Sequence, residues 1–146
     1  MTPDVNVLVA ASRADHPQHA VALAWLESAA DAAQTGAALT LMPMVLASFL
    51  RLVTNPRIFQ RPTPIDNAVE FVDALVAIAG VRVAPLGPEW PKLRALCRTQ
   101  QLAANELPDA WLAAAVLHLD EHLFSFDKDF KRLLPRQQFT LLAANS

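Results

Sequence analysis

The sequence predicts an α/β fold in which a mainly parallel β-sheet is flanked by helices. Short apolar, strand-like runs alternate with longer segments of helical periodicity, the pattern of a layered α/β sandwich. Of its 146 residues, 53% are hydrophobic and only 18% are charged, which argues against disorder. No repeat, low-complexity linker or composition break divides the chain. We therefore expect one domain spanning residues 1–146.

The helical segments are bounded by residues that favour helix starts and stops. Pro43 suits a first helical turn, and Asn55-Pro56 ends that helix. Gly80 is a stop signal, and Pro108 suits the start of a later helix. We expect helices over His16–Ala33, Met44–Thr54, Pro64–Ala79, Pro88–Gln101 and Leu107–Leu119, and a short helix over Lys128–Leu134. The expected strands are Ala38–Met42, Val81–Ala84, His122–Phe126 and an edge strand at Phe139–Leu142.

The first ten residues allow two interpretations. Val5–Ala10 is apolar and β-branched enough to form a strand. Alternatively, Asp4 or Asn6 caps a helix that begins there, which leaves only Thr2–Asp4 as strand. The local pattern fits both.

Composition excludes several classes of function. A net charge of −2 gives no global attraction to nucleic acid, so a protein that coats nucleic acid is not expected. A single cysteine, Cys97, excludes an internal disulfide and a cysteine-based zinc cluster. No apolar run is long enough for a membrane span, and no secretion signal opens the chain. We expect a cytoplasmic protein.

Three aspartates stand at turns that lead into predicted helices. They are Asp4, Asp109 and Asp127, and Asp129 follows Asp127 by two positions. Each alone is explained by helix capping, because aspartate accepts backbone N–H bonds there. Their joint placement is harder to explain, because ligands of parallel α/β sheets bind beyond the strands' carboxyl ends. Clustered carboxylates repel unless protonated or neutralised by a cation, and oxygen ligands favour Mg²⁺ or Mn²⁺. The pattern predicts a candidate acidic metal site.

At these aspartates the sequence resembles the PIN-domain family. Asp4–Leu8 resembles its opening Asp-x-Asn motif, and Pro108–Ala114 its Asp-Ala-x-Leu-Ala-Ala helix start. Ser125–Phe130 is similar to its Thr-x-Asp-x-Asp-Phe strand end. Phe49–Arg57 further resembles one VapC-like branch. The motifs occur in the family's order, and the similarity covers essentially the whole chain.

The resemblance implies a PIN-like three-layer sandwich with a sheet of about five strands. Asp4 would end the first strand, and a helix would start near Asn6. VapC-like proteins are endoribonuclease toxins of type II toxin-antitoxin systems, so we expect RNA phosphodiester hydrolysis with Mg²⁺ or Mn²⁺. A VapB-like antitoxin and a homodimer are the implied partners.

Motif positions carry roles over to single residues. Asp4, Asp109 and Asp127 match the metal-binding, catalytic aspartates. Asp129 matches an additional acidic position, and Asn6 the polar neighbour that orients the first aspartate.

One position departs from the family pattern. Many PIN domains place a glutamate on the second helix, about where this chain has Ser48. A hydroxyl can hydrogen-bond a metal-bound water but brings no charge. Three outcomes are then open: the site holds one ion less tightly, it recruits Glu106 or Asp129 instead, or the protein is a catalytically decayed module that binds RNA or protein.

Three further residues are candidates for RNA contact. Arg51 and Arg57 can clamp the backbone, since arginine suits bidentate phosphate contact. Trp111, two residues from Asp109, can stack on a base.

Overall fold

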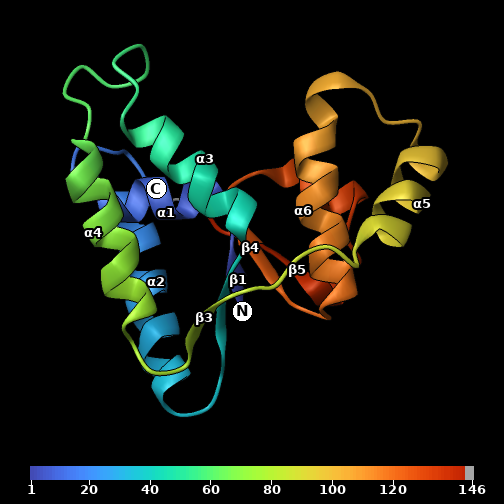
Figure 1. Ribbon diagram of the computed structural model, residues 1–146, viewed down its shortest axis with the longest axis horizontal. Coiled ribbons are helices and arrows are strands. Elements are labelled where there is room, and N and C mark those ends of the chain that lie inside the picture. Colours follow the sequence, from blue (N-terminus) through green and yellow to red (C-terminus); the bar gives the residue numbers. More distant parts are fainter. Residues whose placement is uncertain (144–146) are drawn as a thin grey trace.

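The computed structural model describes residues 1–143 and confirms an α/β architecture (Figure 1). Residues 144–146 of the predicted domain lie outside the described part. The strands are β1 (Thr2–Pro3), β2 (Leu39–Leu41), β3 (Val81–Val83), β4 (Leu123–Ser125) and β5 (Phe139–Leu141). The α-helices are α1 (Val5–Ser12), α2 (His19–Gln34), α3 (Pro43–Val53), α4 (Ile65–Val76), α5 (Trp90–Gln100) and α6 (Leu107–His118). The 3₁₀ segments are η1 (Ala104–Glu106), η2 (Lys128–Arg132) and η3 (Arg136–Gln138).

All of the strand pairings in the described residues are parallel. β4 lies between β1 and β5, with Thr2 opposite Leu123, and β2 pairs with β3 separately. The two groups meet where the backbone N–H of Thr40 donates to the carbonyl oxygen of Met1 at 2.8 Å. The strands therefore follow the spatial order β3-β2-β1-β4-β5, and β5 is the predicted edge strand.

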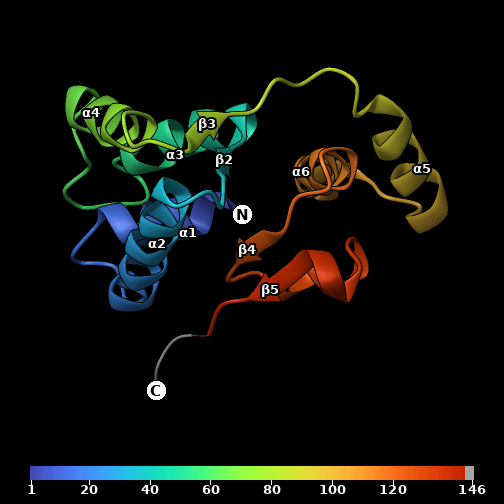
Figure 2. The same cartoon turned by 90° about the horizontal axis from the view of Figure 1, so that it is seen from below.

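The helices form two layers around the strands. Figures 1 and 2 show α1–α4 on one side and the α5–α6 pair on the other, with the strands between them. One apolar core cluster joins these layers, and Leu8, Leu39, Leu123 and Phe130 are fully buried in it. The predicted three-layer sandwich is confirmed. None of the helices within residues 1–143 has both the length and the apolarity needed to cross a bilayer.

The opening of the chain is a two-residue strand followed by a helix. Asp4 is the helix N-cap, and its Oδ1 accepts a hydrogen bond from the backbone N–H of Val5 at 2.7 Å. The apolar run is helical because α1 is enclosed by core, with Val7 and Leu8 fully buried. The interpretation of Val5–Ala10 as a strand is wrong, and the family resemblance placed the helix start within one residue.

Two helix boundaries differ from the sequence prediction by three residues, the largest shifts among the helices. α2 starts at His19, not His16, because the residue before Pro17 is disfavoured in the α conformation. α4 ends at Val76, and the following turn leads to Gly80 at a φ of 85°. A Cβ at Gly80 would lie 2.0 Å from the carbonyl oxygen of Ala33. Gly80 thus permits a close backbone approach rather than ending the helix directly.

A buried arginine fastens the α3–α4 loop to the end of α1. Arg13 is 7% exposed, and its Nε and Nη2 donate to both carboxylate oxygens of Asp15 at 3.1 and 2.8 Å. Its Nη1 donates to Thr63 Oγ1 and its Nη2 to the Arg61 carbonyl oxygen. The guanidinium carbon also lies 3.8 Å from the centre of the Phe59 ring. This cation is fully compensated by its neighbours.

Candidate metal centre

The candidate site lies beyond the carboxyl ends of β1 and β4. These strands are parallel neighbours, and the backbone N–H of Asp4 donates to the Phe124 carbonyl oxygen at 2.9 Å. Asp127 follows β4 and is the N-cap of η2. The pairing therefore brings residues 4 and 127 to the same edge of the sheet, as expected for a ligand site in a parallel fold.

Ser125 connects the residues at this edge. Its hydroxyl, fully buried at the end of β4, donates to Asp4 Oδ2 at 2.7 Å. The same oxygen accepts the backbone N–H of Asp127 at 2.9 Å and the Nδ2 of Asn6 at 3.1 Å. Asn6 thus acts on Asp4 through Ser125. Sequence reasoning assigned Ser125 no role, although its place two residues before Asp127 in the matched motif was a usable signal.

Asp4 is a buried carboxylate with two donors and no cation. It is 6% exposed, and burial raises its pKa. The hydrogen bonds from Ser125 and Val5 lower the pKa of Asp4, while the charge of Asp127 raises it, and the net shift is upward. Each carboxylate oxygen has two lone pairs, so both retain acceptor capacity.

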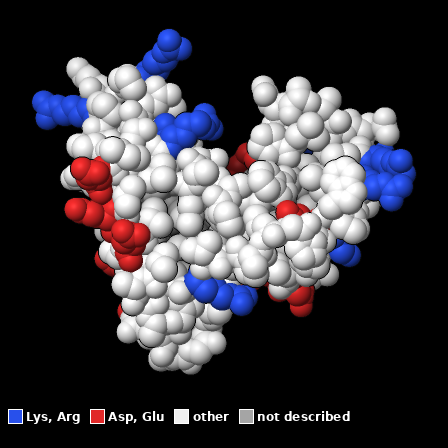
Figure 3. Space-filling view, viewed as in Figure 1, with Lys and Arg blue, Asp and Glu red and all other residues white. Residues whose placement is uncertain are grey.

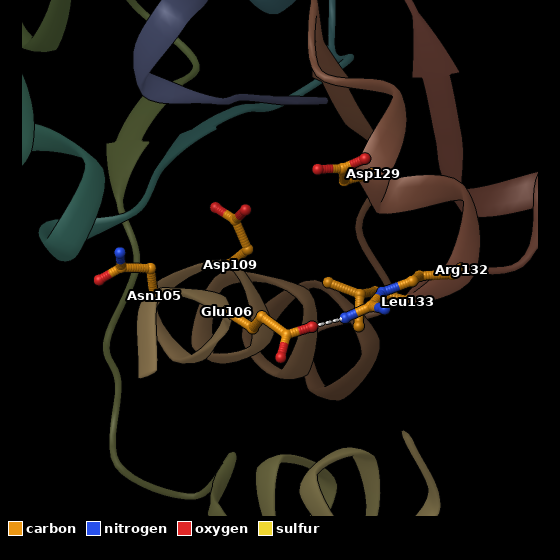
Figure 4. A pocket seen from close by; sticks show the side chains of 6 residues that line it. All are labelled: Asn105, Glu106, Asp109, Asp129, Arg132 and Leu133. Atoms are coloured by element: carbon orange, nitrogen blue, oxygen red, sulfur yellow. Dashed lines mark hydrogen bonds and ion pairs between the residues drawn. The ribbon is translucent and has the colours of Figure 1, made fainter. Parts of the chain in front are cut away.

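Asp109 enters the same space from the first turn of α6. Figure 4 shows its carboxylate and that of Asp129, on η2, pointing into one pocket from opposite walls. The cavity measures about 330 Å³. Burial, followed by the charges of Asp4, Asp127 and Asp129, raises the pKa of Asp109 to about 6. The raised pKa of Asp109 therefore reflects its burial first and the repulsion from the neighbouring carboxylates second.

We call these four aspartates the acid cluster. They come from three segments that are far apart in the sequence, and no cationic side chain contributes to the raised pKa values of Asp4 and Asp109. A set of carboxylate oxygens suits Mg²⁺ or Mn²⁺ better than zinc. In the described part of the chain, no three Asp, Glu, His or Cys side chains are already arranged to hold one ion. The donor chemistry fits a hard divalent cation, and binding requires the side chains to draw together.

Comparison with protein families identifies the fold. The PIN domain model matches residues 1–133, which include the acid cluster. The chain belongs to the PIN-domain family. It is 38% identical over 130 residues to Ribonuclease VapC25 of Mycobacterium tuberculosis, a match covering 88% of this chain and 89% of that protein. It is 40% identical to Ribonuclease VapC43 of the same species, covering 88% and 86%. These relatives place this PIN domain among the VapC proteins.

A solved structure agrees with this fold. The chain matches a chain of VapBC2 from Rickettsia felis, whose crystal structure is bound to a DNA fragment from their promoter. The TM-score is 0.66 with 14% identity, and the match covers 97% of this chain and 98% of that one. At this identity, the likeness concerns the fold alone.

Of the two acids expected to replace the glutamate missing at Ser48, Asp129 is the one whose charge acts on Asp109. The alternative, Glu106, lines the pocket but is paired with Arg132, and the backbone N–H of Ala103 and this arginine lower its pKa. Glu106 also does not contribute to the raised pKa of Asp109, whereas Asp129 does. Ser48 is half-buried in α3, does not line this pocket, and its hydroxyl bonds to no described residue.

The residues predicted to contact RNA lie around the site rather than in it. Arg51 is exposed on α3 and Arg57 is exposed in the α3–α4 loop. The Trp111 ring is 40% exposed, and its Nε1 donates to Glu89 Oε1 at 2.9 Å, away from the pocket lining. Figure 3 shows a notch between the α3 and α6 sides, with acidic atoms at its floor and basic side chains on the α3 side.

Proposed function

We propose that this PIN domain is a metal-dependent endoribonuclease toxin that hydrolyses RNA phosphodiester bonds. The observation that carries the proposal is the acid cluster, in which burial and then the charges of the neighbouring aspartates raise the pKa of Asp109 to about 6. Burying like charges together is costly, and strongly perturbed carboxylates in a pocket are typical of functional sites. The names of the VapC ribonucleases supply the substrate class.

Asp4, Asp109 and Asp127 are the residues that would hold Mg²⁺ or Mn²⁺, with Asp129 as a further acid. When bound, such an ion lowers the pKa of a coordinated water and neutralises charge on the phosphate. The chain fixes two of the ligands in advance. Ser125 holds Asp4, and the backbone N–H of Asp129 donates to Asp127 Oδ1 at 2.9 Å. Asp109 is then the metal-holding residue whose side chain can still change its position.

The partners follow from the same family relation. RNA would enter the notch in Figure 3. The exposed Arg51 on α3 and Arg57 in the α3–α4 loop would contact its backbone, and Trp111 would stack on a base outside the pocket. A VapB-like antitoxin would neutralise the toxin, in line with the toxin–antitoxin complex that shares this fold. We further propose a homodimer that acts in the cytoplasm.

The test is RNA cleavage by purified protein with EDTA, Mg²⁺ or Mn²⁺. We expect cleavage only with the metals, and a loss of at least about 100-fold for Asp109→Asn, which keeps the size and removes the charge. Asp73→Asn on α4, an exposed aspartate outside the site, is the matched control and should cleave normally. Full activity of Asp109→Asn with EDTA present would refute the proposal.

A non-catalytic binding module is the second candidate. It is favoured by Ser48 in place of a glutamate and by the absence of three pre-arranged ligands in residues 1–143. Calorimetric titration with Mn²⁺ separates the two functions. The nuclease should bind the ion in wild-type protein and lose that binding in Asp109→Asn, whereas a decayed site should release no heat in either protein.

A further inference from the structure

The pocket that holds Asp109 and Asp129 is lined by one basic residue, Arg132. The remaining lining residues are Asn105, Glu106 and Leu133. An acidic pocket repels a phosphodiester unless cations offset its charge. Arg132 is a positive charge in the lining of this pocket, so it bears directly on RNA binding.

Arg132 is held in place from both walls of the pocket. Its Nη2 donates to Glu106 Oε2 at the start of α6, 26 residues earlier in the chain (Figure 4). Glu106 is itself fixed, because its Oε1 accepts the backbone N–H of Ala103 at 3.1 Å. The carbonyl oxygen of Arg132 accepts a bond from Gln100 Nε2 at 3.3 Å. The guanidinium is thus tied to Glu106 within the lining of the pocket that Asp109 and Asp129 share.

Stability does not account for this arrangement. The Arg132 and Glu106 side chains are 50% and 43% exposed, and exposed ion pairs contribute between zero and about 1 kcal/mol. Glu106 occupies one of the five guanidinium donors, and the Nε and Nη1 of Arg132 have no partner among residues 1–143. Those donors suit the two non-bridging oxygens of a phosphate.

Three other arginines lack the combination of a place in the pocket lining and unpaired donors. Arg13 has its donors committed to the α3–α4 loop. Arg82 is paired with Glu121 and bonds Thr40. Arg51 is exposed but does not line the pocket.

We propose that Arg132 binds a phosphate group of the RNA at the acid cluster, with Glu106 as the residue that positions its guanidinium. This inference rests on the proposed ribonuclease function and adds the substrate-binding cation that the family motifs do not assign. Arg132 offsets the charge of the acidic wall for the incoming phosphate, while Glu106 keeps the guanidinium within the pocket.

Binding is measured by fluorescence anisotropy of a labelled single-stranded RNA, with Asp109→Asn as the parent protein so that no cleavage interferes. We expect added Arg132→Gln to weaken binding about tenfold and to reduce the slope of log affinity against log salt by about one. Arg132→Lys should restore the slope but only part of the affinity, since lysine lacks the planar fork. Glu106→Gln should weaken binding, because its neutral amide holds the guanidinium less firmly, and should leave the salt slope unchanged, because Arg132 keeps its charge.

Arg94→Gln, which replaces an exposed arginine of α5 outside the pocket, is the matched control and should change neither affinity nor salt slope. In the cleaving protein, Arg132→Gln should raise KM about tenfold and leave kcat within about twofold. Equal RNA affinity and equal salt slope with and without Arg132→Gln would overturn this inference alone. Cleavage by Asp109→Asn would instead overturn the proposed function, and the binding data would still decide the role of Arg132.

Discussion

Two regions of this protein bury charge in opposite ways. Beside the α3–α4 loop, Arg13 is enclosed by a carboxylate, a hydroxyl, a carbonyl and an aromatic ring. At the acid cluster, Asp4 is as deeply buried, yet its nearest charged neighbour is another aspartate. The first arrangement stabilises the fold, whereas the second costs stability unless a ligand arrives. The contrast separates a structural charge from one retained for binding.

The largest effect should come from breaking the compensated region. Arg13→Gln removes the charged donor of several hydrogen bonds and leaves the Arg61 carbonyl without its partner. We expect the free energy of unfolding to fall by about 3 kcal/mol, measured by urea denaturation. Arg13→Lys should recover only part of this loss, because it cannot reproduce the fork. A change below about 0.5 kcal/mol would show that this contact does not hold the loop.

Adding a divalent cation should remove the contrast by compensating the acid cluster. At a Mn²⁺ concentration of 100 times its Kd, the free energy of unfolding should rise by about 2.7 kcal/mol. The gain should shrink as the pH falls below about 6, because protonation of Asp109 competes with the ion. Asp109→Asn should lose most of the gain. Equal stabilisation of both proteins by Mn²⁺ would place the ion elsewhere.

Ser125 supplies the partial compensation that the acid cluster has. Ser125→Ala leaves Asp4 Oδ2 without its buried donor and the Asp127 backbone N–H without its acceptor. We expect a loss of about 2 kcal/mol in the free energy of unfolding. Ser12→Ala, which removes a hydroxyl bonded only to the Val9 carbonyl within α1, should cost much less. If both variants lost the same free energy of unfolding, Ser125 would not connect the residues of the acid cluster.

The smallest expected effect is a gain in the free energy of unfolding when the charge of Asp109 is removed. The folded-state pKa of Asp109 is raised from 3.8 to about 6, so the folded protein binds this proton more tightly than the unfolded chain. The group's stabilisation is therefore lost as the pH rises from about 4 through 6. With solvent screening, the metal-free Asp109→Asn variant should be more stable than wild type by about 1 kcal/mol at pH 7. Thermal unfolding at pH 7 and pH 4 checks this, and the gain should vanish at pH 4.

The sequence predicted most elements because apolar periodicity and proline positions mark them, and α3 and α6 agree within one residue. It left the segment after Asp4 open for a physical reason. α1 is buried almost all round, so it has no polar stripe from which a helical period could be read. The motif match resolved what periodicity could not.

The candidate site was predicted unevenly for a related reason. Asp4, Asp109 and Asp127 follow recognisable patterns, and the structure brings them within electrostatic reach of each other. In the sequence, Ser125 is an ordinary residue at the end of a strand. Its role follows only from its three hydrogen-bond partners in the structure. The pair of Glu106 and Arg132 joins residues 26 positions apart, and no local pattern reports such a contact.

The insertion of β4 between β1 and β5 has a consequence for how the protein is made. Asp4 is synthesised about 120 residues before its partners Ser125 and Asp127. A nascent chain cannot complete the acid cluster before β4 is synthesised and docked beside β1. A chain that stops ahead of β4 lacks Ser125, Asp127 and Asp129, so the topology makes assembly of the acid cluster depend on a segment that is synthesised late.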